Sequence, residues 1–168
     1  MRGNAVEWED DAIPADVNAV DDIGLRLEVP AVGLDVPVGS VAATAGVVTP
    51  PGFTSAYLVT NMGAGASDPA QGTVYVAMQS LRDGGVGPGN YLIDVEAASA
   101  SVAVGTEVRL GDATYRVAGS RAIAKGALAG DDEVWRSEND RLVLITCLQR
   151  SNGGPSVENV VIFADRVG

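Results

Sequence analysis

The chain has 168 residues, of which 46% are hydrophobic, and its 22 acidic and 11 basic side chains give a net charge of −11. That length and apolar content suit one domain with a sizeable core. An acidic surface repels phosphate backbones, so we expect no nucleic acid partner. Lys125 is the only lysine, which excludes a P-loop. One cysteine excludes an internal disulfide, and the lack of histidine excludes Cys/His zinc sites and a catalytic histidine.

The N-terminal segment is acidic and has little periodicity. We interpret residues 1–24 as a solvated N-terminal arm that precedes a β domain at residues 25–168. It has no basic-then-apolar secretory pattern, and no run of about 18 apolar residues predicts a membrane span. We therefore expect that any export or anchor segment lies outside this sequence.

Short apolar and alternating runs separated by Gly, Pro and Asp predict a β protein with almost no helix. The connection at residues 61–71 is expected to be a loop or one short helix, residues 83–90 a turn, and residues 127–136 a polar connection. Gly111-Asp112 predicts a hairpin between two of the strands. The pattern favours an antiparallel barrel or sandwich. The predicted strands are residues 25–29, 32–38, 57–60, 72–78, 91–95, 107–110, 114–118, 141–147 and 157–164.

The strand at residues 141–147 ends on the chain's single thiol, Cys147, and a Ser/Asn/Gly-rich loop follows it. A thiol where a rigid strand meets a loop is expected to be both held and exposed. An ordinary thiol with a pKa of about 8.5 is a few per cent thiolate at neutral pH, which permits slow attack on a carbonyl. The alternative is an inert, buried strand-end thiol.

Taken in order, several segments resemble the sortases, the cysteine transpeptidases of Gram-positive surfaces. Residues 27–30 (LEVP) with 36–38 (VPV) resemble the first strand, and residues 72–79 (GTVYVAMQ) resemble the strand that leads to the catalytic histidine. Residues 104–108 with 115–117 resemble a hairpin of the family, and residues 144–147 (LITC) resemble the signature around the nucleophile. The resemblance covers about residues 25–165. It implies a closed eight-stranded β-barrel with one or two short helices and a substrate groove beside Cys147.

Two positions depart from the family. Gln79 stands where sortases have the catalytic histidine, and Asn159 falls near the position of the family's arginine. Arg150, three residues after the thiol, could instead hydrogen-bond a developing oxyanion, or it could be a solvated loop charge. We expect Cys147, Gln79 and Arg150 to meet at the mouth of one groove.

An amide has no titratable proton, so Gln79 cannot protonate a departing amine as an imidazolium would. Loss of a general acid lowers the rate by about 10²–10⁴, or roughly 3–5 kcal/mol of barrier. We therefore expect an impaired enzyme.

The resemblance implies further roles for residues around the thiol. Ala77, Thr146, Leu148 and Asn159 are the expected substrate-binding residues. Asp131, Asp132 and Glu133 lie where some sortases hold calcium, although three adjacent acids in a loop are more often solvated. We expect no metal and no organic cofactor.

The function implied is cleavage of a Leu-Pro-x-Thr-Gly-like sorting signal after its threonine, through a thioester on Cys147. A cell-wall precursor or pilin amine then resolves the thioester, at the extracellular face of the cell membrane. Two alternatives stay open: a catalytically silent sortase-like module that binds a peptide, and a β-barrel interaction protein with an inert thiol.

Overall fold

A computed structural model describes residues 20–42, 50, 52–63, 71–81, 85–152, 154 and 156–167. Most of the predicted acidic arm, residues 1–19, lies outside the described residues, and so does most of the predicted loop at residues 61–71. The division into an arm and a domain therefore stays a prediction.

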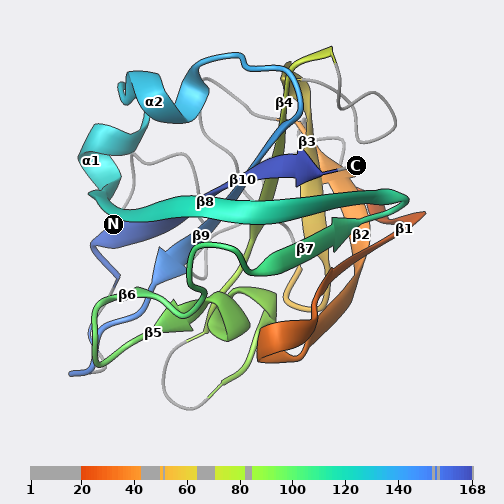
Figure 1. Cartoon of the computed structure of the whole chain (residues 1–168). Coiled ribbons are helices and arrows are strands. Elements are labelled where there is room, and N and C mark those ends of the chain that lie inside the picture. The colour runs from red at the N-terminus through yellow and green to blue at the C-terminus, as the bar shows by residue number, and fades with distance from the viewer. Residues whose placement is uncertain are drawn as a thin grey trace.

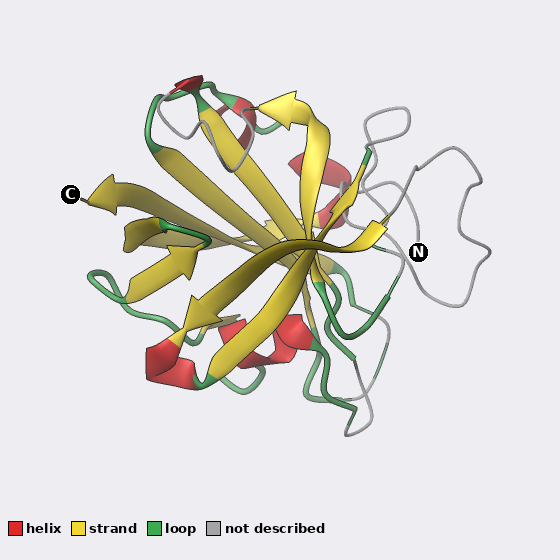
Figure 2. Ribbon diagram, turned by 90° about the vertical axis from the view of Figure 1, so that its right-hand side faces the viewer, coloured by secondary structure: helices red, strands yellow, loops and turns green. Residues whose placement is uncertain are grey.

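Eight strands close into a barrel in the order β1-β2-β3-β4-β9-β10-β8-β7, which confirms the expected fold class (Figure 1). Neighbouring strands are antiparallel except for the pairs β2–β3 and β4–β9, which are parallel. The short helices lie at the periphery of the barrel (Figure 2). The barrel strands are β1 (Val20–Val29), β2 (Leu34–Val41), β3 (Ala56–Gly63), β4 (Thr73–Met78), β7 (Glu107–Leu110), β8 (Ala113–Ala124), β9 (Arg141–Leu148) and β10 (Glu158–Val167).

The remaining elements are short. They are the 3-10 helices η1 (Pro30–Val32) and η3 (Pro88–Leu92), the two-stranded sheet β5 (Ile93–Asp94) and β6 (Ser99–Ala100), and the helices α1 (Lys125–Leu128) and α2 (Asp132–Trp135). The predicted hairpin across Gly111-Asp112 is confirmed as β7–β8, and Gly111 has the positive φ, +57°, that its turn requires.

The predicted strand at residues 91–95 is confirmed only at Ile93–Asp94, which form β5, because Tyr91 and Leu92 belong to η3 and Val95 lies in a turn. Pro88 occupies the helix start, where its fixed φ is favourable. The side chain of Asn90 accepts hydrogen bonds from the backbone N–H groups of Leu81 and Gly87, at 2.8 and 2.7 Å, and it donates to the Leu81 carbonyl. These local bonds hold the segment in a compact turn. The predicted polar connection at residues 127–136 likewise contains α2 and the second half of α1.

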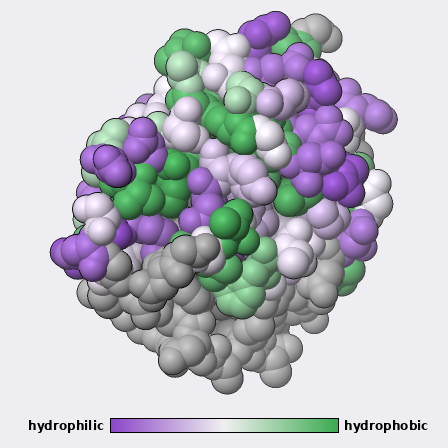
Figure 3. All heavy atoms as spheres, turned by 90° about the horizontal axis from the view of Figure 1, so that it is seen from below, coloured by the Kyte–Doolittle hydropathy of each residue, from purple (hydrophilic) through white to green (hydrophobic). Residues whose placement is uncertain are grey.

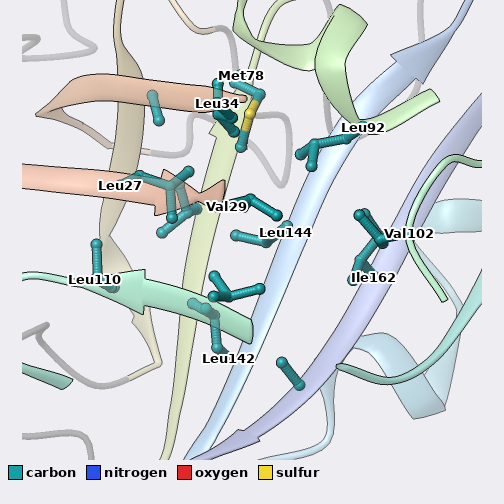
Figure 4. Packing of buried hydrophobic residues seen from close by; sticks show 14 of the residues in the cluster. Leu27, Val29, Leu34, Met78, Leu92, Val102, Leu110, Leu142, Leu144 and Ile162 are labelled. Atoms are coloured by element: carbon teal, nitrogen blue, oxygen red, sulfur yellow. The ribbon is translucent and has the colours of Figure 1, made fainter. Parts of the chain in front are cut away.

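The buried hydrophobic residues form two clusters, one on each face of the sheet. They divide in this way because successive residues of a strand face opposite sides. One cluster takes residues from all eight strands and fills the barrel; it includes Leu27, Leu110 and Leu144 (Figure 4). The other, which we call the outer cluster, lies on the opposite face of β3, β4, β9 and β10. There Leu128 of α1 and Val134 of α2 pack against the sheet.

Figure 3 shows hydrophobic and hydrophilic side chains interspersed on the face that is seen from below. Among the helices of the described residues, none is long and apolar enough to cross a membrane.

Candidate active site

The register of three strands aligns Gln79, Cys147 and Asn159 across the outer face of the sheet. Cys147 of β9 pairs directly with Asn159 of β10, so the two side chains lie on the same face. Met78, at the end of β4, pairs with Thr146, which places Gln79 next to Cys147. We call these three residues the site row. The strand positions predicted from the family resemblance for Gln79 and Asn159 are thus next to the thiol.

Lys125 brings a charge to this row. It follows β8 directly, and its backbone N–H donates to the Val157 carbonyl at 3.0 Å. Its Nζ donates a hydrogen bond to Cys147 Sγ at 3.3 Å. Lys125 is only 3% exposed, so this ammonium lies against the sulfur in a site that bulk water does not reach.

The expectation that the thiol is exposed is wrong, because Cys147 has an exposed fraction of 0%. Its side chain belongs to the outer cluster, among the apolar residues of β4, β9 and β10. The Lys125 side chain lies on the sulfur as well. A peptide can therefore reach the sulfur only if neighbouring side chains move.

Gln79 is also buried, with 1% exposure. Its Nε2 donates to the Pro50 carbonyl at 2.7 Å. Its Oε1 finds no hydrogen-bond partner within the described part of the chain. A buried amide oxygen without a partner costs free energy, and it could accept a hydrogen bond from a bound ligand.

Side-chain hydrogen bonds hold the end of β4 against the end of β9. The hydroxyl of Ser80 donates to the Cys147 carbonyl at 2.6 Å, and Gln149 Nε2 donates to the Ser80 hydroxyl at 2.8 Å. Gly89 of η3 donates its N–H to the Gln79 carbonyl at 2.8 Å. A Cβ at Gly89 would overlap Thr146 Oγ1, so glycine is required for this close approach. These contacts fix the backbone around the site row on the side of η3.

The structure does not place Arg150 in the site row. Arg150 is exposed in the loop after β9 and lines a surface hollow of about 290 Å³ together with Glu96, Asn152 and Glu158. The described residues that line this hollow do not include Cys147 or Gln79. Cys147 and Gln79 thus lie at neighbouring positions, but both are buried, and their meeting with Arg150 at the mouth of a groove stays a prediction. A cation at the sulfur comes from Lys125. The role of Arg150 as an oxyanion clamp stays a prediction.

The other predicted substrate-binding residues lie on two different faces. Ala77 belongs to the outer cluster, on the same face as Cys147. Leu148 belongs to the cluster inside the barrel, and Thr146, one residue before Cys147, faces η3, where its Oγ1 lies close to Gly89. Substrate contact by these residues stays a prediction, and for Leu148 and Thr146 it would have to come from the η3 side of the strand.

The acidic residues near α2 form ion pairs and a helix cap. Arg121 binds the carboxylates of Asp131 and Glu133, at 2.8 and 2.5 Å. Asp131 also accepts the N–H of Val134 as the cap of α2. The Arg121 guanidinium holds the pKa of Asp131 below its usual value. No group of three metal-ligating side chains is found within the described ranges. Calcium here stays untested.

Sequence reasoning noted Lys125 as the only lysine but missed its place in the site. The available signal was local: residues 122–128 read AIAKGAL, in which the lysine is the only charged residue. A lysine in an apolar segment is expected to be paired if it is buried. Its partner could not be identified because Cys147 lies 22 residues away and on a strand that does not pair with β8 in the barrel.

The solved structures most similar in fold are sortases. A lid mutant of sortase A from Corynebacterium diphtheriae is 13% identical, with a TM-score of 0.63 over 92% of this chain and 74% of that one. Sortase C2 of pilus island 1 from Group B Streptococcus is 12% identical, with a TM-score of 0.59 over 88% and 75% of the two chains. Sortase A from Listeria monocytogenes is 19% identical, with a TM-score of 0.55 over 86% of each chain.

At these identities the likeness shows the fold: the chain has the closed barrel of the sortases. No protein-family model and no curated protein sequence matches it.

Proposed function

We propose that this protein is a sortase-like cysteine transpeptidase. It would cleave a Leu-Pro-x-Thr-Gly-like sorting signal after the threonine and join the acyl product to a cell-wall or pilin amine, at the extracellular face of the cell membrane. The observation that carries the proposal is the site row within a sortase barrel, with a buried ammonium 3.3 Å from the only thiol of the chain.

The reactive form of Cys147 is the thiolate, and a neighbouring ammonium favours the thiolate over the neutral thiol. Attack on the carbonyl carbon of the threonine forms a carbon–sulfur bond, and release of the amine leaves a thioester. An incoming amine then attacks the thioester and regenerates the thiolate. Gln79 Oε1 is available to accept a hydrogen bond from an N–H of the bound peptide.

Gln79 limits this chemistry, because its amide can neither give nor take a proton. If no other group moves the proton, acylation by a peptide amide is slower by about 10²–10⁴ than with a titratable residue at this position. Asn159 is an amide as well, so it can donate hydrogen bonds to an oxyanion but carries no charge.

A silent peptide-binding module is the second candidate, and a specific observation favours it. Both the sulfur and Gln79 are buried, so the chain as it stands does not present an open nucleophile. A module of this kind would bind the sorting signal in the groove without forming a thioester.

The test is mass spectrometry of the intact protein after incubation with a Leu-Pro-Ala-Thr-Gly peptide, with Cys147→Ala as the control. We expect a slow, hydroxylamine-sensitive adduct on the wild-type chain and none on the variant. Since Cys147 is the only cysteine, an adduct at sulfur has one possible position.

Restoring Gln79→His separates the enzyme from the silent module. The two side chains are similar in bulk, so the strand end should keep its shape. The enzyme proposal fails if neither the wild-type nor the Gln79→His protein is acylated although the peptide binds. If iodoacetamide does not alkylate Cys147 in the native protein, with or without peptide, the thiol is structural.

A further inference from the structure

We propose that Lys125 is the proton-transfer residue of this site and replaces the imidazole that the chain lacks. The inference rests on the proposed function and names a catalytic group for it. Three observations support it: the contact between Nζ and Sγ, the burial of Lys125, and the chemistry of the other residues in the row.

The position of Nζ is the first argument. In the intermediate formed by attack of Sγ on a peptide carbonyl, the departing nitrogen is bonded to the same carbon as the sulfur. An ammonium that lies 3.3 Å from Sγ before attack is therefore within hydrogen-bond reach of that nitrogen after a small rotation of the lysine side chain.

Elimination is the second argument. Gln79 and Asn159 are amides, the chain has no histidine, and a guanidinium such as that of Arg150 does not release its proton. A lysine side chain, in contrast, can give a proton as an ammonium and take one as an amine, so it can serve as a catalytic acid or base. Among the described side chains of the site, Lys125, which donates to Sγ, is therefore the one to which we assign the proton transfer.

The proposed steps balance in protons and electrons. The Cys147 thiolate attacks the carbonyl carbon, and the carbon–nitrogen bond breaks as the departing amine takes a proton from the Lys125 ammonium. The acyl-enzyme then holds a thioester and a neutral lysine. When the second amine attacks the thioester carbon, the neutral lysine takes the proton that this amine loses, and the carbon–sulfur bond breaks. The site returns to thiolate and ammonium.

This role predicts a dependence on the leaving group. A peptide amide needs a proton on its leaving nitrogen, whereas a thiolate leaves from a thioester without one. The quantity to measure is the ratio of two acylation rates of Cys147, one with the Leu-Pro-Ala-Thr-Gly peptide and one with a Leu-Pro-Ala-Thr thioester of the same acyl group. Any change in the amount of thiolate affects both rates and cancels in the ratio.

Two variants test the ratio. Lys125→Arg keeps the charge but cannot release a proton at working pH, and Lys125→Met keeps the length of the side chain without charge. We expect the amide-to-thioester ratio to fall by about 10²-fold or more in both, as removal of a general acid requires. Circular dichroism shows whether each variant is folded. The amide-to-thioester ratio of one folded variant is enough to test the role of Lys125.

An unchanged ratio in a folded variant overturns the role of Lys125 and leaves the proposed function intact. If the wild-type protein is acylated by neither the peptide nor the thioester, the proposed function itself fails. The outcomes are distinguishable because the thioester reports on the nucleophile alone.

Discussion

Lys125 and Cys147 are both buried, and the hydrogen bond between them lowers the free energy that burial of the ammonium costs. An ammonium removed from water loses hydration free energy, and the hydrogen bond to Sγ offsets part of that loss. The same contact gives the thiol a cationic neighbour, which a purely structural cysteine in an apolar cluster does not need. At this scale, stability and reactivity depend on one interaction.

Mutation of both residues measures this coupling. Cys147→Ala in the wild-type background removes the acceptor and leaves the ammonium buried, so we expect it to destabilise the fold by about 1–3 kcal/mol. In a Lys125→Met background the same substitution should have a smaller effect, which gives a coupling free energy of about 0.5–3 kcal/mol. Urea unfolding of the four proteins measures it. Additive effects would contradict the coupling.

The neighbouring positions of Gln79, Cys147 and Asn159 could be predicted from the family resemblance, because their segments match the family segments that carry the site. The burial of the sulfur and the contact with Lys125 could not. They depend on how the segment that leaves β8 passes over β9, and no local pattern in residues 122–128 encodes that path. Similarly, residues 91–95 (YLIDV) form a short apolar run that predicts a strand, but only Ile93–Asp94 is one, because the bonds of Asn90 hold the preceding segment in a turn.

At the scale of elements, Arg141 fastens the α2 region to the start of β9. Its side chain is buried, and it donates to the carbonyls of Glu133, Val134 and Arg136 and to Thr73 Oγ1. Its guanidinium also lies over the ring of Phe163, 5.5 Å from the centroid. The orphan carbonyls at the end of α2 thus receive donors from one cation, and the hydroxyls of Tyr75 and Thr73 donate to two of them as well.

Loss of this cation should therefore destabilise the region that covers the outer cluster. We expect Arg141→Met to lower the free energy of unfolding by about 2–4 kcal/mol, because the hydrogen bonds of Arg141 to Thr73 Oγ1 and to three carbonyls are lost at once. Arg116→Met is the matched control, since Arg116 is exposed and donates to the Gly105 carbonyl at the surface. Thermal unfolding compares the two. Equal losses of stability in the two variants would show that the buried hydrogen bonds of Arg141 stabilise the fold no more than those of a surface arginine.

Asp131 makes the stability of the α2 region depend on pH, and the lowered pKa of its carboxyl gives the sign of that dependence. The side chain is 13% exposed, and its pKa is lowered chiefly by the hydrogen bonds from Arg121, with the cap to Val134 adding to the effect. Because the folded pKa lies below the unfolded value, the stabilisation is present above about pH 4 and is lost as the pH falls through the folded pKa.

Replacement by asparagine isolates the charge. We expect Asp131→Asn, which keeps a capping side chain, to be less stable than the wild type by about 1 kcal/mol at pH 7. The difference should shrink as the pH falls below about 4, where the wild-type carboxylate becomes protonated. Urea unfolding at a series of pH values measures it. A difference that is constant from pH 7 to pH 2 would contradict the charge pairing with Arg121.

On the scale of the whole molecule, neighbouring strands of the barrel differ in how many residues they pair. β10 pairs with β8 from Glu158 to Val167 and with β9 from Glu158 to Asp165, so the site row lies in the most extensively paired part of the sheet. The seam between β1 and β7 pairs only Leu27 with Leu110 and Glu28 with Arg109. The salt bridge of Arg109 with Glu28 across this seam is exposed and is therefore weak.

Hydrogen exchange should reveal this asymmetry. A seam with few ladder bonds opens without disrupting β9 and β10, so its amides require only a sub-global opening. We expect the amides at the β1–β7 seam to exchange at least about tenfold faster than those of β9 and β10, which corresponds to roughly 1.4 kcal/mol in opening free energy. Amide exchange followed by NMR at neutral pH measures both groups. If the β9 amides exchange as fast as those of the seam, β9 itself opens locally. Such opening would expose the Cys147 thiol without any rearrangement of the packed side chains.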